Sequence, residues 1–194
     1  MKSFLLTTER LGLRAFLPED LDAFAAMNAD PRVMQHFPAT LSREESKALM
    51  DRVNQRLTEF GFTFWAAEIL ETEALIGFIG IVRTSIDTYF TPCVEIGWRL
   101  APQYWGKGYA TEGAKESLRF AFEEQNIPEI YSFTPHTNQR SHKVMQRLGM
   151  KPQGTFNHPV VGDDHPLNPH LLYRISQDEW LEQQLDQRTS APGL

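Results

Sequence analysis

The fold is decided by one stretch, which reads Cys93-Val94-Glu95-Ile96-Gly97-Trp98-Arg99-Leu100, then Trp105-Gly106-Lys107-Gly108-Tyr109-Ala110, then a helical pattern from Thr111 to Gln125. Its first part is apolar like a strand, and Pro102 ends that strand. Two glycines and a small alanine in the turn let a backbone approach a ligand without Cβ clashes. A turn that feeds a helix also aims unpaired N–H groups, supported by the helix dipole, at an anion. The stretch therefore predicts a ligand that carries phosphate.

Two well-known nucleotide-binding patterns are absent from this turn. Gly106 and Gly108 are followed by Ala110 and Thr111, so the dinucleotide pattern G-x-G-x-x-G fails. Lys107 lies between the glycines and is not followed by Ser or Thr, so the Walker pattern fails as well. The stretch also lies halfway along the chain, whereas dinucleotide-binding folds usually begin with it.

The rest of the chain divides into strand and helix patterns. Strands are predicted at Leu11–Phe16, Phe64–Ile69, Leu75–Val82, Val94–Leu100, Ile130–Thr134 and His170–Ile175. Helices are predicted at Pro18–Met27, Ser42–Phe60, Thr111–Gln125, Arg140–Leu148 and around Trp180. Ser42 and Glu45 form a capping box at the start of the second helix, and Gly61 ends it.

These elements predict the fold class and the domain organisation. Strands outnumber helices and a helix joins the two central strands, so we expect an α+β (mixed α/β) fold with one sheet. The 194 residues are enough for one well-cored domain and too few for two of ordinary size. We expect a single domain over residues 1–186 and a flexible C-terminal tail over residues 187–194, which have no periodicity.

A second motif follows the strand that ends near Pro135. It reads Asn138-x-x-Ser141-x-x-Val144-Met145-x-x-Leu148-Gly149-Met150. Together with the glycine-bearing turn, it resembles the GCN5-related N-acetyltransferase (GNAT) superfamily, and the order of elements resembles that fold from Leu11 to about Ile175. The resemblance implies one GNAT-like domain with helices on both faces of a central mixed sheet. That sheet is expected to splay between its two central strands and to bind acetyl-CoA as a co-substrate.

The resemblance also assigns the cofactor contacts. The pyrophosphate arm of GNAT proteins has the form [Gln/Arg]-x-x-Gly-x-[Gly/Ala]; Gly108 and Ala110 match its last two anchors, while Trp105 replaces the first. That replacement affects a side-chain contact and leaves the amide cradle intact. The expected acetyl-CoA contacts are Trp98, Arg99, Leu100, Trp105, Gly106, Lys107, Gly108, Tyr109, Ala110, Asn138 and Ser141.

Two further segments indicate which branch of the superfamily the chain resembles. Thr7–Arg14 and Ala29–Met34 look like the opening of the RimJ/RimL-type ribosomal-protein N-acetyltransferases, and so does Glu95-Ile96-Gly97-Trp98 with its following turn. This likeness implies transfer of the acetyl group of acetyl-CoA to a primary amine by direct attack on the thioester. The acceptor is either a protein N-terminal α-amine or the amine of a small molecule, because the branch contains enzymes of both kinds.

Catalysis needs a base for the amine and a donor for the leaving thiolate. Glu95 shares one strand face with Gly97 and Arg99, and burial there would raise its pKa toward neutrality. The alternatives for Glu95 are a partner of Arg99 or Arg83, or a solvated strand end.

The position where many GNAT enzymes carry a thiolate-protonating Tyr is Met145, which cannot donate a proton. Ser141 is therefore the candidate for the thiolate, unless it bonds only its own backbone. Asn138 suits the peptide-like pantetheine arm and equally suits a helix N-cap.

Composition limits the partners. A net charge of −6 argues against nucleic acid, no apolar run approaches a membrane span, and the single Cys93 excludes an internal disulfide. The six histidines show no zinc-like spacing, so no metal is expected. We expect a cytoplasmic monomer or homodimer. Two other functions stay open, namely an acyl-CoA transferase with a non-acetyl donor and a catalytically silent acetyl-CoA-binding sensor.

Overall fold

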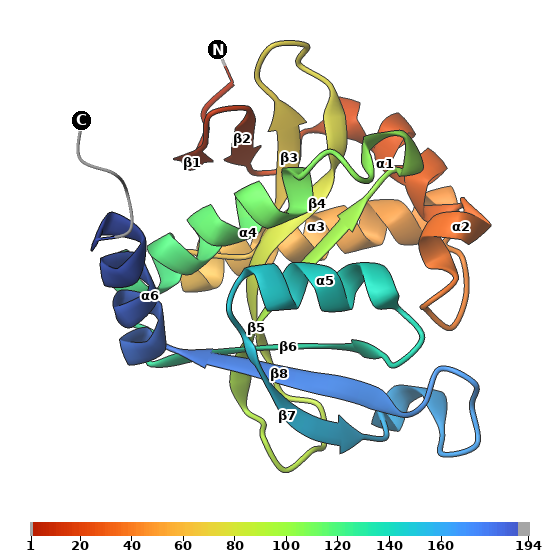
Figure 1. The fold of residues 1–194 in the computed structure, drawn as a ribbon. Helices are drawn as coiled ribbons and strands as arrows, with labels where there is room; N and C mark the ends of the chain where they lie inside the picture. Colours follow the sequence, from red (N-terminus) through yellow and green to blue (C-terminus); the bar gives the residue numbers. More distant parts are fainter. Residues whose placement is uncertain (1, 190–194) are drawn as a thin grey trace.

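The computed structural model describes residues 2–189, which form one open, mixed sheet (Figure 1). The eight strands lie in the order β1-β2-β3-β4-β5-β6-β8-β7. They are β1 (Leu6–Thr7), β2 (Leu11–Arg14), β3 (Phe64–Ile69), β4 (Leu75–Thr84), β5 (Cys93–Leu100), β6 (Glu129–Pro135), β7 (Lys151–Phe156) and β8 (His170–Ser176). Neighbouring strands are antiparallel except β5 and β6, which are parallel. The expected α+β fold is confirmed.

Helices cover both faces of the sheet, as expected. They are α1 (Leu21–Asn28), α2 (Pro31–Met34), α3 (Arg43–Phe60), α4 (Tyr109–Arg119), α5 (Gln139–Arg147) and α6 (Gln177–Thr189), with a π-helical turn at Phe120–Glu124 after α4. Helices α4 and α5 lie in front of the sheet in Figure 1, and α3 crosses behind it. Each face has its own hydrophobic core, one beneath α4, α5 and α6 and one beneath α1, α2 and α3.

The longest helix, α3, begins and ends where its sequence predicts. The Ser42 hydroxyl accepts a hydrogen bond from the Glu45 amide at 3.1 Å, and the Glu45 carboxylate accepts one from the Ser42 amide at 2.7 Å. Gly61 follows the last turn with φ of 78°, a conformation that favours glycine. Local side-chain chemistry therefore determines both ends.

The two central strands separate after a short contact. Only one residue pair, Glu95 with Tyr131, joins β5 to β6, while β4 pairs with β5 along its length. Just beyond that pair, the hydroxyl of Ser132 donates to the carbonyl of Ile96 at 3.0 Å. The Ile96 carbonyl is thus bonded to a side chain, whereas in a continued β-ladder it would accept from a backbone amide of β6. The sheet opens at this point, as expected.

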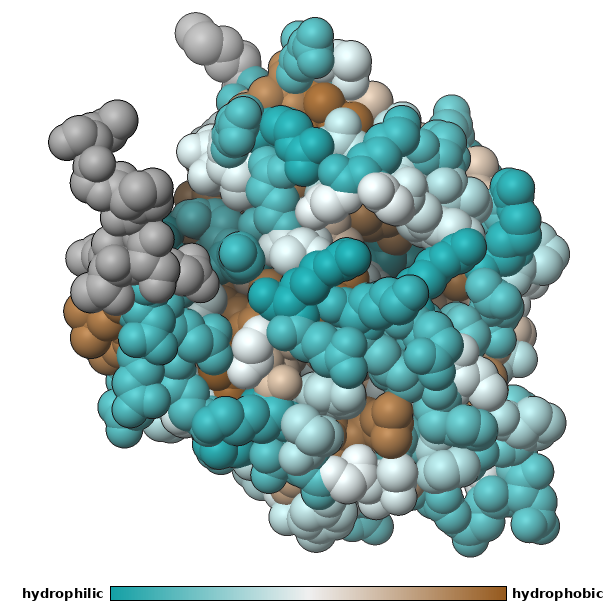
Figure 2. Space-filling model, viewed as in Figure 1, coloured by the Kyte–Doolittle hydropathy of each residue, from teal (hydrophilic) through white to brown (hydrophobic). Residues whose placement is uncertain are grey.

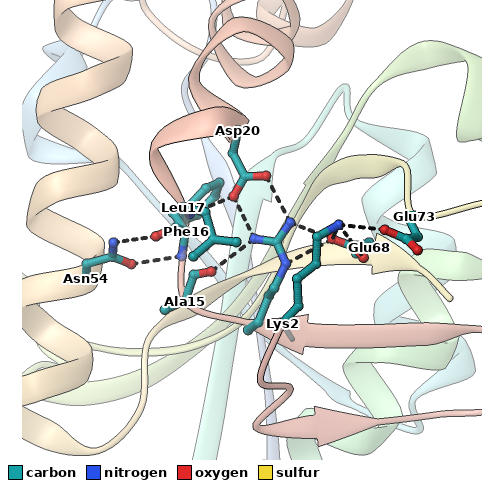
Figure 3. A network of polar contacts seen from close by, with 9 residues as sticks. Lys2, Ala15, Phe16, Leu17, Asp20, Asn54, Glu68 and Glu73 are labelled. Carbon is teal, nitrogen blue, oxygen red and sulfur yellow. Dashed lines mark hydrogen bonds and ion pairs between the residues drawn. The ribbon is translucent and has the colours of Figure 1, made fainter.

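A buried ion network fixes the opposite half of the sheet (Figure 3). Arg14 on β2 donates to Asp20 at 2.6 Å and to Glu68 on β3 at 2.6 Å. Lys2 donates to Glu68 at 3.0 Å and to the exposed Glu73 at 3.3 Å. Since all three members of the Arg14 cluster are buried, each charge depends on its partners.

Four elements differ from the sequence prediction. Strand β7 was not predicted, because Pro152 and Gly154 interrupt its pattern; it lies at the sheet edge, where proline is tolerated, with a register shift between those two residues. Helix α6 continues to Thr189, so residues 187–189 are helical where a flexible tail was expected. Residues 190–194 of that expected tail lie outside the described part of the chain. The short β1 and α2 were also missed.

Candidate active site

A cavity of about 540 Å³ opens where β5 and β6 separate. It reaches from the turn before α4 to α5 and to the segment after α2. The sequence-predicted residues that line it are Glu95, Trp98, Arg99, Leu100, Trp105, Gly106, Gly108, Tyr109, Ala110, Asn138 and Ser141. Lys107 does not line it; this side chain is exposed, with its ammonium 5.8 Å from the ring centre of Tyr104.

The turn before α4 presents free backbone amides to this cavity. Gly106 and Gly108 have φ of 75° and 87°, and Gly108 is the N-cap of α4 without a side-chain cap. Within residues 2–189, the first hydrogen-bonded amide after Trp105 is that of Glu112, which donates to the Gly108 carbonyl at 3.0 Å. The amides from Gly106 to Thr111 therefore have no partner in the described chain, which is the arrangement that suits a phosphate.

Helix α4 is held in place by Arg10, the residue directly before β2. Arg10 donates to the carboxylate of Glu112 at 2.7 Å and to the carbonyl of Lys107 at 3.1 Å. A Cβ on Gly108 would lie 3.3 Å from the Arg10 guanidinium. Arg10 therefore fixes the turn on the side away from the cavity, and the amides of the turn stay free on the cavity side.

Trp105 has a structural role that its position in the motif did not indicate. Its indole N–H donates to the carbonyl of Leu100 at 2.7 Å, and the guanidinium of Arg140 lies 4.2 Å from the centre of its ring. The indole therefore joins the end of β5 to the turn and to α5. Arg140, which lines the cavity, was not predicted as a site residue because its position in the Asn138 motif has no required residue type.

The direction of the β5 backbone determines which of its three predicted residues can offer free backbone groups to a ligand. The Ala101 amide donates to the Ile76 carbonyl at 2.9 Å, and antiparallel pairing alternates, so the backbone groups of Arg99 are directed at β4. The Arg99 carbonyl lies so close to β4 that a Cβ on Gly77 would be 2.0 Å away. The backbone N–H and C=O of Trp98 point to the opposite side of β5, where β6 has separated, and they pair with no strand there. Of the three predicted residues, Trp98 alone keeps both backbone groups free for a ligand.

Glu95 is an acid without an ion-pair partner. It is partly buried, and neither a hydrogen bond nor an ion pair joins it to another residue in the range 2–189. Arg99 donates to Asn28 and Arg83 stacks on Phe60, so the two pairings considered from sequence are not made. Burial raises the pKa of Glu95 to about 8, against the opposing attraction of the Arg56 charge.

Asn138 and Ser141 form one hydrogen-bonded unit at the start of α5. The Asn138 amide nitrogen donates to Thr134 Oγ1 at 2.9 Å and to Ser141 Oγ at 3.1 Å, and its oxygen accepts from the Ser141 amide at 3.3 Å. Asn138 is thus the N-cap, and both of its donor hydrogens are used. Ser141 Oγ accepts in this unit, which leaves its own hydrogen available. Met145 is fully buried and packs in the core.

Aromatic residues around the cavity were largely missed. His158 and His170 line it with their rings 5.1 Å apart, and both contact Phe156. Burial lowers the pKa of His170 to about 4. Phe37 also lines the cavity, whereas Phe62 and Trp65 belong to the core. Phe156, His158 and His170 come together through the pairing of β7 with β8, for which the sequence holds no local signal.

Comparison with known proteins decides the family. The model of the acetyltransferase (GNAT) domain matches residues 10–151. The chain belongs to the GNAT family of acetyltransferases. It is therefore an acyltransferase enzyme, and acetyl-CoA is the co-substrate of that family.

Individual relatives agree over nearly the full length. The chain is 30% identical to an uncharacterized N-acetyltransferase of Bacillus subtilis, over 90% of this chain and 98% of the relative. A Bacillus anthracis acetyltransferase structure of the GNAT family superposes with a TM-score of 0.74 at 26% identity, covering 90% of this chain and 99% of that one. A more distant relative, 24% identical over 90% of this chain and 92% of its own length, is the Escherichia coli [ribosomal protein uS5]-alanine N-acetyltransferase.

Two kinds of feature are absent from residues 2–189. No helix there is long and apolar enough to cross a membrane. No group of three or more His, Cys, Asp or Glu side chains in that range is arranged to hold a metal ion.

Proposed function

We propose that this GNAT enzyme transfers the acetyl group of acetyl-CoA to a primary amine by direct attack on the thioester. The observation that carries the proposal is the arrangement of one cavity. It joins a phosphate-suited turn with free amides, from Gly106 to Thr111, to the open edge of β5 and to the unpaired carboxyl of Glu95. A pyrophosphate, an extended amide-bearing arm and an amine therefore each have a place suited to their chemistry.

The residues present fit acetyl-CoA at the turn and along β5. The amides of Gly106, Gly108 and Ala110 would hold the pyrophosphate, and Arg140 adds a positive charge beside them. The free backbone carbonyl of Trp98 would pair with the pantetheine arm, because buried backbone groups need partners. Asn138 would accept through its second oxygen lone pair and orient Ser141. Bound there, acetyl-CoA supplies the activated acetyl group.

Glu95 is the proposed base. An amine must be neutral to attack, and a carboxyl with a pKa near 8 is matched to taking its proton at physiological pH. An ammonium that arrives beside Glu95 also favours the carboxylate form, because an opposite charge lowers the pKa of an acid. Proton transfer can run directly or through one water molecule. The backbone amide of Trp98 lies on the open side, where it would stabilise the developing oxyanion.

Ser141 is the proposed donor to the leaving sulfur. Its oxygen accepts from Asn138, which fixes the hydroxyl and leaves its hydrogen free to point into the cavity. We expect Ser141→Ala to lower turnover without rescue at high pH, since the sulfur and not the amine loses its partner.

The likeness to the alanine N-acetyltransferase favours the RimJ/RimL-type branch, in which the acceptor is either a protein N-terminal α-amine or the amine of a small molecule. One alternative remains, a donor with a larger acyl group; the other, a silent acetyl-CoA sensor, disagrees with membership of an acetyltransferase family. Met145, at the position where a Tyr is common in the superfamily, favours the sensor; Glu95 and Ser141 in the same cavity favour the enzyme.

Calorimetric titration with acetyl-CoA tests the proposed turn. Gly108→Val should weaken binding strongly, because Gly108 has a positive φ and its amide must stay close to the pyrophosphate. The matched control is Gly61→Val, which has a similar φ of 78° and open space around its Cβ but lies outside the cavity. Trp105→Ala should cost less affinity than Gly108→Val. Parental affinity in Gly108→Val would overturn the assignment of the turn.

A further inference from the structure

Arg99 is a partly buried cation that no anion of the described chain neutralises. Its guanidinium donates to Asn28 Oδ1 at 2.9 Å and lies 4.0 Å from the ring centre of Phe37 and 5.2 Å from that of Phe78. The Nε atom is buried and has no hydrogen-bond partner within residues 2–189. Burial lowers the pKa of Arg99 to about 10, the direction expected when no carboxylate offsets desolvation.

The same side chain faces the place where the acceptor must enter. Residues 95, 97 and 99 share one face of β5, and that face is covered by α1, α2 and the segment with Phe37. A Cβ on Gly97 would lie 3.9 Å from Glu95 Oε1, so the carboxyl of Glu95 leans toward Gly97. Gly97 and Arg99 are two residues apart, about 7 Å along the strand. A proposed base and an unpaired cation therefore flank one short stretch of open cavity.

The charges lining the cavity separate two kinds of acceptor. Among the lining residues of the described chain, Glu95 is the one acid, and Arg32 and Arg99 lie on the acceptor side of the sheet. A polyamine or a lysine-rich peptide would bring more positive charge beside Arg99, at a large desolvation cost. An amine that also carries a carboxylate would instead give Arg99 the bidentate partner that its planar fork prefers.

We propose that the acceptor is a small amine bearing a carboxylate a few bonds from its nitrogen, as in a free amino acid, and that Arg99 binds this carboxylate. The proposal rests on the proposed acetyl transfer and deepens it. In this proposal Arg99 selects the acceptor: its guanidinium binds the substrate, while its backbone groups are directed at β4. A peptide N-terminus lacks this carboxylate and would be a poorer acceptor.

The test measures thiol release from acetyl-CoA with matched acceptors. Free amino acids and 3-aminopropanoate are each compared with their own carboxamides, which differ only at the carboxyl group, and with a polyamine. More of each carboxamide is present as neutral amine at pH 7.5, so chemistry without recognition would favour the carboxamides. We expect the acids to be better by roughly 10–100-fold in kcat/KM, the effect of one charge-assisted contact.

Substitution of Arg99 completes the test. Arg99→Gln should abolish the preference for acids while acetyl-CoA affinity, measured by calorimetry, stays within about twofold. Arg99→Lys keeps the charge but not the fork and should retain part of the preference. Arg32→Gln is the matched control, because Arg32 lines the same cavity but is exposed and already paired with Asp30, and it should keep the full preference.

Several results would overturn the assignment. These are carboxamides or polyamines that react as fast as the acids, a preference retained in Arg99→Gln, or acids that neither react nor bind while acetyl-CoA does bind. Should Arg99→Gln fail to fold, the comparison of acids with carboxamides on the parent protein still decides. Failure of the proposed acetyl transfer looks different, because then no amine of any class would release the thiol.

Discussion

At the scale of single residues, the proposed site contains two ionisable side chains that have no ion-pair partner in the described chain. Glu95 and Arg99 stand on the same face of β5 without an ion-pair partner in the described chain, although burial disfavours the charged form of each. Structural ion pairs in the same molecule look different, since Arg14 is matched by two carboxylates. Unpaired charges at a cavity are a common sign of a functional site.

The first prediction concerns turnover. Glu95→Gln should keep acetyl-CoA affinity and lower kcat by roughly 10²–10⁴-fold at neutral pH, the usual contribution of a general base. The loss should shrink at high pH, where the free amine is already neutral. Steady-state rates against pH check this, with Ser141→Ala as the variant whose loss does not shrink. A near-parental rate for Glu95→Gln at neutral pH would make Glu95 a structural residue.

The second prediction concerns stability. The pKa of Glu95 is raised from 4.5 to about 8, so the folded state holds this proton more tightly than the unfolded state. The contribution of protonated Glu95 to the free energy of unfolding is fully present below pH 4.5. It is lost as pH rises to about 8, at a rate of up to about 1.4 kcal/mol per pH unit. Glu95→Gln cannot lose a proton and should gain stability relative to the parent across this window. Denaturant unfolding at several pH values measures it; parallel pH curves would contradict it.

At the scale of elements, local chemistry was readable from the sequence and long-range pairing was not. The capping box of Ser42, the helix stop at Gly61 and the turn before α4 depend on residues a few positions apart, and all three were predicted correctly. The separation of β5 and β6 was expected only through the family resemblance. The direction of the Arg99 backbone groups depends on the register with β4, which a single sequence does not reveal.

The third prediction concerns the buried network that joins β2 to β3. Glu68→Gln should destabilise the protein by about 3–5 kcal/mol, because it removes a buried carboxylate that pairs with Arg14 at 2.6 Å. Glu73→Gln is the matched control, since the Glu73 carboxylate is exposed and pairs with Lys2 at 3.3 Å, and it should change stability little. Chemical denaturation measures both variants. Equal effects would mean that burial does not determine the strength of this network.

At the scale of the whole molecule, the open sheet offers a separate face to each of the two proposed substrates. The turn before α4 and the hydrophilic outer surface of α5 lie on one face (Figure 1, Figure 2), while Glu95, Gly97 and Arg99 face α1 to α3 on the other. The gap between β5 and β6 connects them within one cavity. A donor on one face and an acceptor on the other can therefore meet beside Ile96 without an acyl-enzyme intermediate.

A crystal structure of the complex with acetyl-CoA tests this account most directly. We expect the pyrophosphate within hydrogen-bond distance of the amides of Gly106, Gly108 and Ala110, and the pantetheine arm paired with the backbone of Trp98. The thioester should then lie in the gap between β5 and β6, next to Glu95 and Ser141. Acetyl-CoA bound elsewhere, or β5 and β6 closed into a continuous ladder around an empty turn, would contradict the account.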